Sequence, residues 1–129
     1  MAFLASMGCS TDDSHTTTAT GNVTCKGQPL SGVMITLQPI APTTGPKASA
    51  PVFSGKFDFD KTTGLHGGSY RVRFSLMPTK IRKTIPVEHA TGLPPDNAVI
   101  GDQYDERSNL TWELSVNQPN EKNFEIELR

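Results

Sequence analysis

Cysteines are scarce in this chain of 129 residues, and aromatic residues make up only 7% of it. Cys9 and Cys25 are too few to build a disulfide scaffold, although one bridge between them stays open. The three histidines are far apart in the sequence, and none has a partner at a spacing typical of metal ligands. We therefore expect neither a disulfide-stapled fold nor a metal site.

Long apolar runs and an excess of charge are absent as well. The sequence has no run of about 18 apolar residues, so no segment predicts a membrane-spanning helix. Twelve basic residues balance 13 acidic ones, which gives a net charge of −1. A nucleic-acid-binding surface needs clustered positive charge, so we expect no nucleic-acid partner.

The N-terminal segment MAFLASMGC places a short apolar stretch before Gly8 and Cys9. It resembles the end of a bacterial lipoprotein signal, in which a cleavage box ends in Gly-Cys, although Ser6 occupies a position that is usually aliphatic. This resemblance implies that residues 1–8 are the remnant of a signal peptide whose true start lies upstream. Cys9 would carry the lipid, and the domain would be anchored to a membrane in the cell envelope. The alternative is an ordinary N-terminus with an unmodified Cys9.

The segment from Ser10 to Gly21 has a single apolar residue, Ala19, among threonines, serines and aspartates. Such a composition cannot bury enough apolar surface to order itself. We therefore expect residues 9–20 to form a flexible tether, with the folded domain over residues 21–129.

From residue 21 onward, apolar and polar residues alternate with the period of two that is typical of strands with one buried face. The segments that show it are GNVTCKG, GVMITLQPI, GKFDFD, SYRVRFSL, LTWELSV and NFEIELR. Tyr70, Val72 and Trp112 fall on apolar faces, so we expect them in the core. Cys25 also falls on an apolar face, which favours a buried, unreactive thiol.

Turn residues separate these segments, as in Lys26–Pro29 and Asn117–Asn120. No stretch of about 11 residues has a helical period. Short strands with one apolar face each predict two sheets packed face to face. We expect an all-β fold, a single Greek-key β-sandwich similar to immunoglobulin domains.

Two segments lack the alternation and are expected to be loops. Pro39–Pro51 is rich in proline, alanine and threonine, and Pro78–Asn109 contains four prolines. A loop as long as the second one in a compact domain is usually functional or partly structured. Within it, KIRKTIPVEH favours a short strand.

Five segments combine turn glycines with alternating residues in a characteristic order: Cys25–Pro39, Gly55–Phe57, Gly64–Ser75, Gln103–Val116 and Asn123–Ile126. Together they resemble carboxypeptidase-regulatory-like domains. The resemblance covers about residues 21–129, and the proline-rich loops fit it least. It implies a seven-stranded prealbumin-like sandwich that stands alone in small lipoproteins and carries no peptidase zinc site. Transthyretin-related hydrolases share this architecture, but their C-terminal Tyr-Arg-Gly-Ser signature is missing here, where the chain ends in FEIELR.

We expect a non-enzymatic module that needs no cofactor and binds an envelope protein or a glycan through the long loop, since loops on rigid sandwiches often carry function. The candidate interaction residues are Lys80, Arg82, Lys83, His89, Asp102, Tyr104 and Asp105. Lys80, Arg82 and Lys83 would form a small basic patch.

Two alternatives use the same loop. Asp102, Asp105 and His89 could supply the acid–base groups of a hydrolase-like enzyme if they converge in a desolvated site. Asp102, Asp105 and Glu106 could form a weak cation site or, more simply, a solvated charge cluster.

Overall fold

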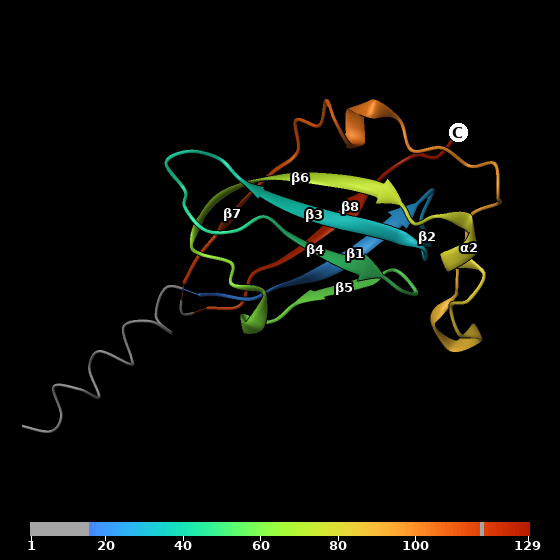
Figure 1. Ribbon diagram of the computed structural model, residues 1–129, viewed down its shortest axis with the longest axis horizontal. Coiled ribbons are helices and arrows are strands. Elements are labelled where there is room, and N and C mark those ends of the chain that lie inside the picture. The colour runs from blue at the N-terminus through green and yellow to red at the C-terminus, as the bar shows by residue number, and fades with distance from the viewer. Residues whose placement is uncertain (1–15, 117) are drawn as a thin grey trace, which may run out of the picture.

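A computed structural model, which describes residues 16–116 and 118–129, contains two four-stranded β-sheets packed face to face (Figure 1). The first sheet contains β1 (Ala19–Cys25), β2 (Gln28–Pro29), β5 (Lys56–Phe59) and β8 (Glu121–Glu125). The second contains β3 (Val33–Pro39), β4 (Ala48–Val52), β6 (Gly68–Leu76) and β7 (Thr111–Leu114). The predicted all-β sandwich is confirmed, and its Greek-key order stays a prediction.

The first sheet is organised around β1. Strand β8 pairs with β1 in parallel, from Thr20 opposite Glu121 to Thr24 opposite Glu125. Strands β5 and β2 pair with β1 in antiparallel orientation and follow each other along it. Because a strand has two edges, β5 and β2 share one edge of β1 and β8 takes the other. The first and last strands of the domain are therefore neighbours.

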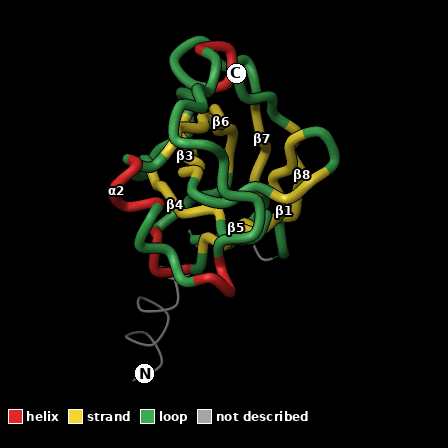
Figure 2. Tube along the Cα trace, turned by 90° about the vertical axis from the view of Figure 1, so that its right-hand side faces the viewer, coloured by secondary structure: helices red, strands yellow, loops and turns green. Residues whose placement is uncertain are grey.

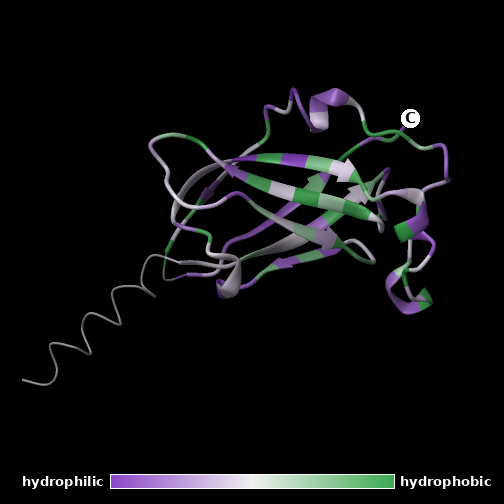
Figure 3. Cartoon of the chain, in the orientation of Figure 1, coloured by the Kyte–Doolittle hydropathy of each residue, from purple (hydrophilic) through white to green (hydrophobic). Residues whose placement is uncertain are grey.

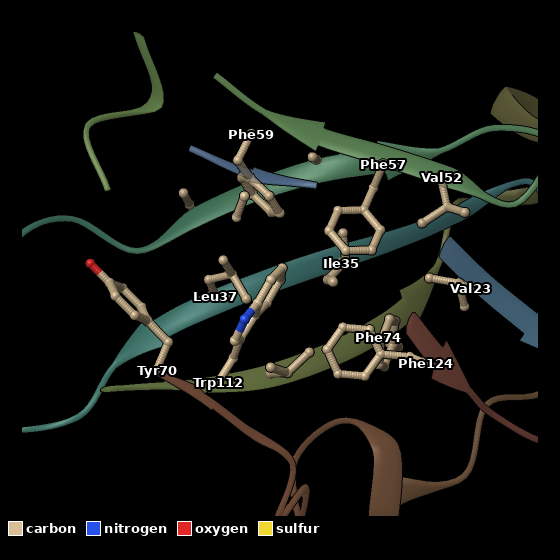
Figure 4. Packing of buried hydrophobic residues seen from close by; sticks show 14 of the residues in the cluster. Val23, Ile35, Leu37, Val52, Phe57, Phe59, Tyr70, Phe74, Trp112 and Phe124 are labelled. Carbon is tan, nitrogen blue, oxygen red and sulfur yellow. The ribbon is translucent and has the colours of Figure 1, made fainter. Parts of the chain in front are cut away.

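The second sheet is antiparallel throughout, in the order β4-β3-β6-β7. Bands of apolar and polar residues alternate along β3 and β6, as Figure 3 shows. The apolar residues point into the space between the sheets, where the aromatic rings of Phe57, Phe74, Trp112 and Phe124 meet (Figure 4). Ring centroids lie 5.7 Å apart for Trp112 and Phe124 and 5.4 Å apart for Phe74 and Phe124, in edge-to-face arrangements. Tyr70, Val72 and Trp112, which the sequence places in the core, are all buried.

Strand β4 starts inside the segment 39–51, for which the sequence predicts a loop, so that prediction is wrong for the last four residues of the segment. Ala48, Ala50 and Val52 are buried and alternate with exposed Ser49 and Pro51. Alanines carry too little apolar surface for the alternation to stand out. The proline is tolerated because β4 is an edge strand.

The domain begins before residue 21, so the expected tether over 9–20 overlaps the sandwich in its last five residues. Thr17 is buried, and its backbone N–H donates to the carbonyl of Leu65 at 2.8 Å. The side-chain amide of Asn120 donates to Thr17 Oγ1 at 3.1 Å, and its oxygen accepts from the N–H of Ser115 at 2.8 Å. These polar partners order a segment that has too few apolar residues to order itself. Residues 1–8 and Cys9 lie outside the described residues.

The two ends of the sandwich differ. We call the end formed by residues 16–18, 40–47 and 60–67 the N-terminal pole, because β1 starts beside it. We call the end formed by residues 26–32, 53–55 and 77–99 the loop pole. In Figure 1 the loop pole carries the short helix α2 (Thr79–Arg82), and the described part of the chain starts at the opposite end. Segment 80–89 forms helical turns rather than the expected short strand.

At the N-terminal pole, the buried ring of Tyr70 closes the core. Its hydroxyl donates to the carbonyl of His66 at 3.0 Å and accepts from the N–H of His66 at 2.9 Å. Burial raises the pKa of Tyr70 above its usual value, and the backbone hydrogen bond with His66 opposes this effect. The Tyr70 hydroxyl is therefore protonated in the folded protein.

Gly21 is expected to be irreplaceable, because a Cβ there would lie 1.8 Å from the carbonyl oxygen of Lys122 and 2.9 Å from the ring of Phe57. We expect Gly21→Ala to lower the free energy of unfolding by more than about 2 kcal/mol, since backbone would have to move. Gly27→Ala is the matched control, because a Cβ there meets nothing within 4 Å and only the positive φ costs about 1 kcal/mol. Urea unfolding measures both changes, and equal losses would contradict this assignment.

Candidate functional site

The loop pole is held together by the buried hydroxyl of Ser31. Its Oγ donates to the carbonyl of Thr91 at 2.5 Å and accepts from the N–H of Ser54 at 2.7 Å. The N–H of Ser31 also donates to the carbonyl of Gly92 at 3.2 Å. Ser31 thus connects its own turn with two segments that are far away in the sequence, around Ser54 and around Thr91. Figure 2, turned so that the loop pole faces the viewer, shows these loops crossing in front of the strands.

Arg82 is buried, with 4% of its surface exposed, so it does not belong to an exposed basic patch. Its Nη2 donates to Thr79 Oγ1 at 3.0 Å and to the carbonyl of Asp96 at 3.3 Å. Its aliphatic stem passes over Gly32, where a Cβ would lie 2.9 Å from Arg82 Cδ. Arg82 therefore ties the two halves of the loop to each other and to the sandwich.

The rest of the loop pole presents both apolar and basic side chains. Lys80 is exposed, and Lys83 Nζ lies 3.4 Å from Asp96 Oδ2 in a solvent-exposed pair that contributes little stability. Ile81 is 52% exposed and Val87 is 89% exposed. Among the described residues, four of the five exposed large hydrophobic side chains lie between positions 78 and 100. A loop that is hydrogen-bonded to the sandwich and exposes these apolar side chains is a candidate contact surface.

The expected interaction residues separate into two groups. His89 lies at the loop pole, where its ring stands 5.8 Å from that of Phe53. Asp102, Tyr104 and Asp105 lie in a second segment beside β6. Asp105 Oδ1 accepts from Arg73 Nε at 2.9 Å, and Tyr104 is half-buried against the core. The long loop therefore offers two separate surfaces instead of one.

The residues of the two alternatives do not converge within the part of the chain that the structure describes. No hydrogen bond or ion pair there joins His89 to Asp102 or Asp105, and Asp102 is exposed. Across residues 16–116 and 118–129, no three His, Cys, Asp or Glu side chains are arranged to hold a metal ion. Cys25 is a half-buried free thiol at the edge of the core.

A pocket that the sequence did not indicate lies beside β6. It has a volume of about 690 Å³ and is lined by Arg71, Gln103, Arg107, Ser108 and Asn109. Arg71 points outward from β6, and its Nε donates to the carbonyl of Ser108 at 3.0 Å. The available signal was an outward arginine on a strand together with a polar run just before the next strand, a pattern that surface residues commonly show.

The fold defines this chain as an all-β sandwich protein. Comparison with family models, curated protein sequences and solved structures finds no match. Within residues 16–116 and 118–129, none of the helices has the length and apolar character needed to cross a bilayer.

Replacing Arg82 is expected to loosen the loop pole, because its two hydrogen bonds and its packing over Gly32 would be lost. In Arg82→Met we expect thermolysin to cut between residues 81 and 99 roughly ten times faster, as the loss of about 1–3 kcal/mol of local stability implies. Lys83→Met removes the same charge from an exposed neighbour and should leave the rate unchanged. Identical rates in both variants would rule out the structural role of Arg82.

Proposed function

We propose that this protein is a non-enzymatic, lipid-anchored β-sandwich of the cell envelope that holds its loop pole out toward a partner protein. The observation that carries the proposal is the position of the loop pole at the far end of the sandwich from the start of β1. Strand β1 begins at Ala19, opposite Phe59, whereas β6 reaches the loop pole at Leu76.

The short segment between Cys9 and the sandwich limits how far the N-terminal pole can lie from the membrane. Seven peptide units separate Cys9 from Thr16, so they span at most about 25 Å. A lipid on Cys9 would therefore keep the start of the sandwich at the N-terminal pole within about 25 Å of the bilayer. Strand β6, with nine residues, spans about 30 Å, so the loop pole can lie well away from the membrane surface.

The surface of the loop pole suits a protein partner. Ile81 and Val87 are exposed on a loop that Ser31 and Arg82 hold in place, so little conformational freedom is lost on binding. Exposed apolar side chains with flanking lysines match a partner surface that is apolar at its centre and acidic at its rim. The resemblance to carboxypeptidase-regulatory-like domains supports a non-enzymatic role, because such domains carry no peptidase zinc site.

Lipidation is tested by the intact mass of the mature protein, expressed in a bacterium from a gene extended upstream of Met1. We expect a chain that starts at Cys9 and carries added acyl mass. Cys9→Ala should accumulate as an unmodified chain. A wild-type protein that keeps residues 1–8 and has no added mass would contradict the anchor.

The partner surface is tested with a photoreactive side chain at Val87 in intact cells. We expect a discrete protein adduct, and Ile81→Asp should reduce its yield at least fivefold because the charge interrupts the apolar surface. Thr62, exposed at the N-terminal pole, is the matched control position and should give no such adduct. Equal adduct yields at both positions, or no effect of Ile81→Asp, would contradict a partner at the loop pole.

A further inference from the structure

The pocket beside β6 is built around an arginine whose position is fixed by the backbone. Arg71 Nε donates to the carbonyl of Ser108, and its Nη2 donates to the carbonyls of Asp105 and Glu106. These bonds hold the guanidinium plane over the segment that leads into β7. Among the described residues, no hydrogen bond or ion pair involves Arg71 Nη1, so the N–H groups of this nitrogen remain for a ligand.

The other polar side chains that line the pocket also have donors to offer. Within the described residues, the side chains of Gln103, Arg107 and Asn109 make no hydrogen bond or ion pair. The Ser108 hydroxyl, in contrast, donates to the carbonyl of Val72 at 2.5 Å. The pocket thus combines two guanidinium groups with two side-chain amides.

The charges around the pocket favour an anion. Its lining carries two positive charges and no carboxylate. Of the nearby acids, Asp105 is paired with Arg73, whereas Asp102 and Glu106 are exposed outside the lining and weaken the positive field. One guanidinium group can donate two parallel hydrogen bonds to two oxygens of a carboxylate or phosphate, whereas an ammonium group acts as a point charge.

The remaining features favour a sugar that carries the anion. Gln103 and Asn109 can both donate to and accept from hydroxyl groups. The pocket is open to solvent, so a bound sugar would keep part of its surface in water. No aromatic ring lines the pocket, so a sugar would be held by hydrogen bonds without stacking.

We propose that this pocket binds an acidic sugar, with its carboxylate or phosphate across Arg71 and Arg107 and its hydroxyls on Gln103 and Asn109. This site lies apart from the loop pole and does not depend on the partner protein proposed above. Uronic acids and sugar phosphates share the required chemistry, and the test separates them.

The test is an NMR titration of the full chain with trigalacturonic acid, glucose 6-phosphate, maltotriose and inorganic phosphate. We expect one of the two acidic sugars to shift the amide signals of residues 103–109, and the more effective one identifies the source of the anion. Maltotriose should cause no shift. Inorganic phosphate should bind at least tenfold more weakly than the acidic sugar, because it lacks the hydroxyls.

Variants locate the binding. Arg107→Met should weaken acidic-sugar binding at least tenfold, whereas Lys83→Met, with the same change of charge at the loop pole, should not change it. Asn109→Ala should weaken binding of the sugar but not of inorganic phosphate. The proposal is overturned if no acidic sugar binds, if inorganic phosphate binds as tightly as the sugars, or if Lys83→Met and Arg107→Met have equal effects.

Discussion

The parallel pairing of β1 with β8 brings the first and last strands of the domain side by side, and it requires a very close approach at Gly21. There, the carbonyl oxygen of Lys122 and the ring of Phe57 occupy the space that any side chain would need. The backbone of β8 can therefore lie against β1 while Phe57 fills the gap beneath it. This contact allows the first and last strands of the domain to pair in parallel.

The connections between the strands lie at the two poles of the sandwich. Because β1 enters at one end, the turns of both sheets divide between the poles, and the long loop after β6 falls at the far one. Two buried polar groups hold this loop against the sandwich: the hydroxyl of Ser31 and the guanidinium of Arg82. Both groups form hydrogen bonds with backbone atoms or neighbouring side chains. The apolar side chains of Ile81 and Val87 lie on the outside of the loop.

Much of the sandwich could be predicted from the sequence because large apolar residues alternate with polar ones along most strands. Strand β4 was missed because alanines supply its buried face. The candidate site was harder to predict. Arg82 stands between lysines and resembles a surface charge, and its burial depends on Gly32, which is 50 residues away in the sequence and has a φ of +78°. Arg71 was missed for a similar reason, since the carbonyls that hold it lie more than 30 residues further along the chain.

We propose that the loop pole faces away from the membrane. The direct measurement is energy transfer from a dye at Val87→Cys or Thr62→Cys, in a Cys25→Ser background, to acceptor dyes on the headgroups of vesicles that carry the lipidated protein. We expect strong transfer from position 62, at the N-terminal pole, and weak transfer from position 87. Equal transfer from both positions, or stronger transfer from position 87, would contradict it.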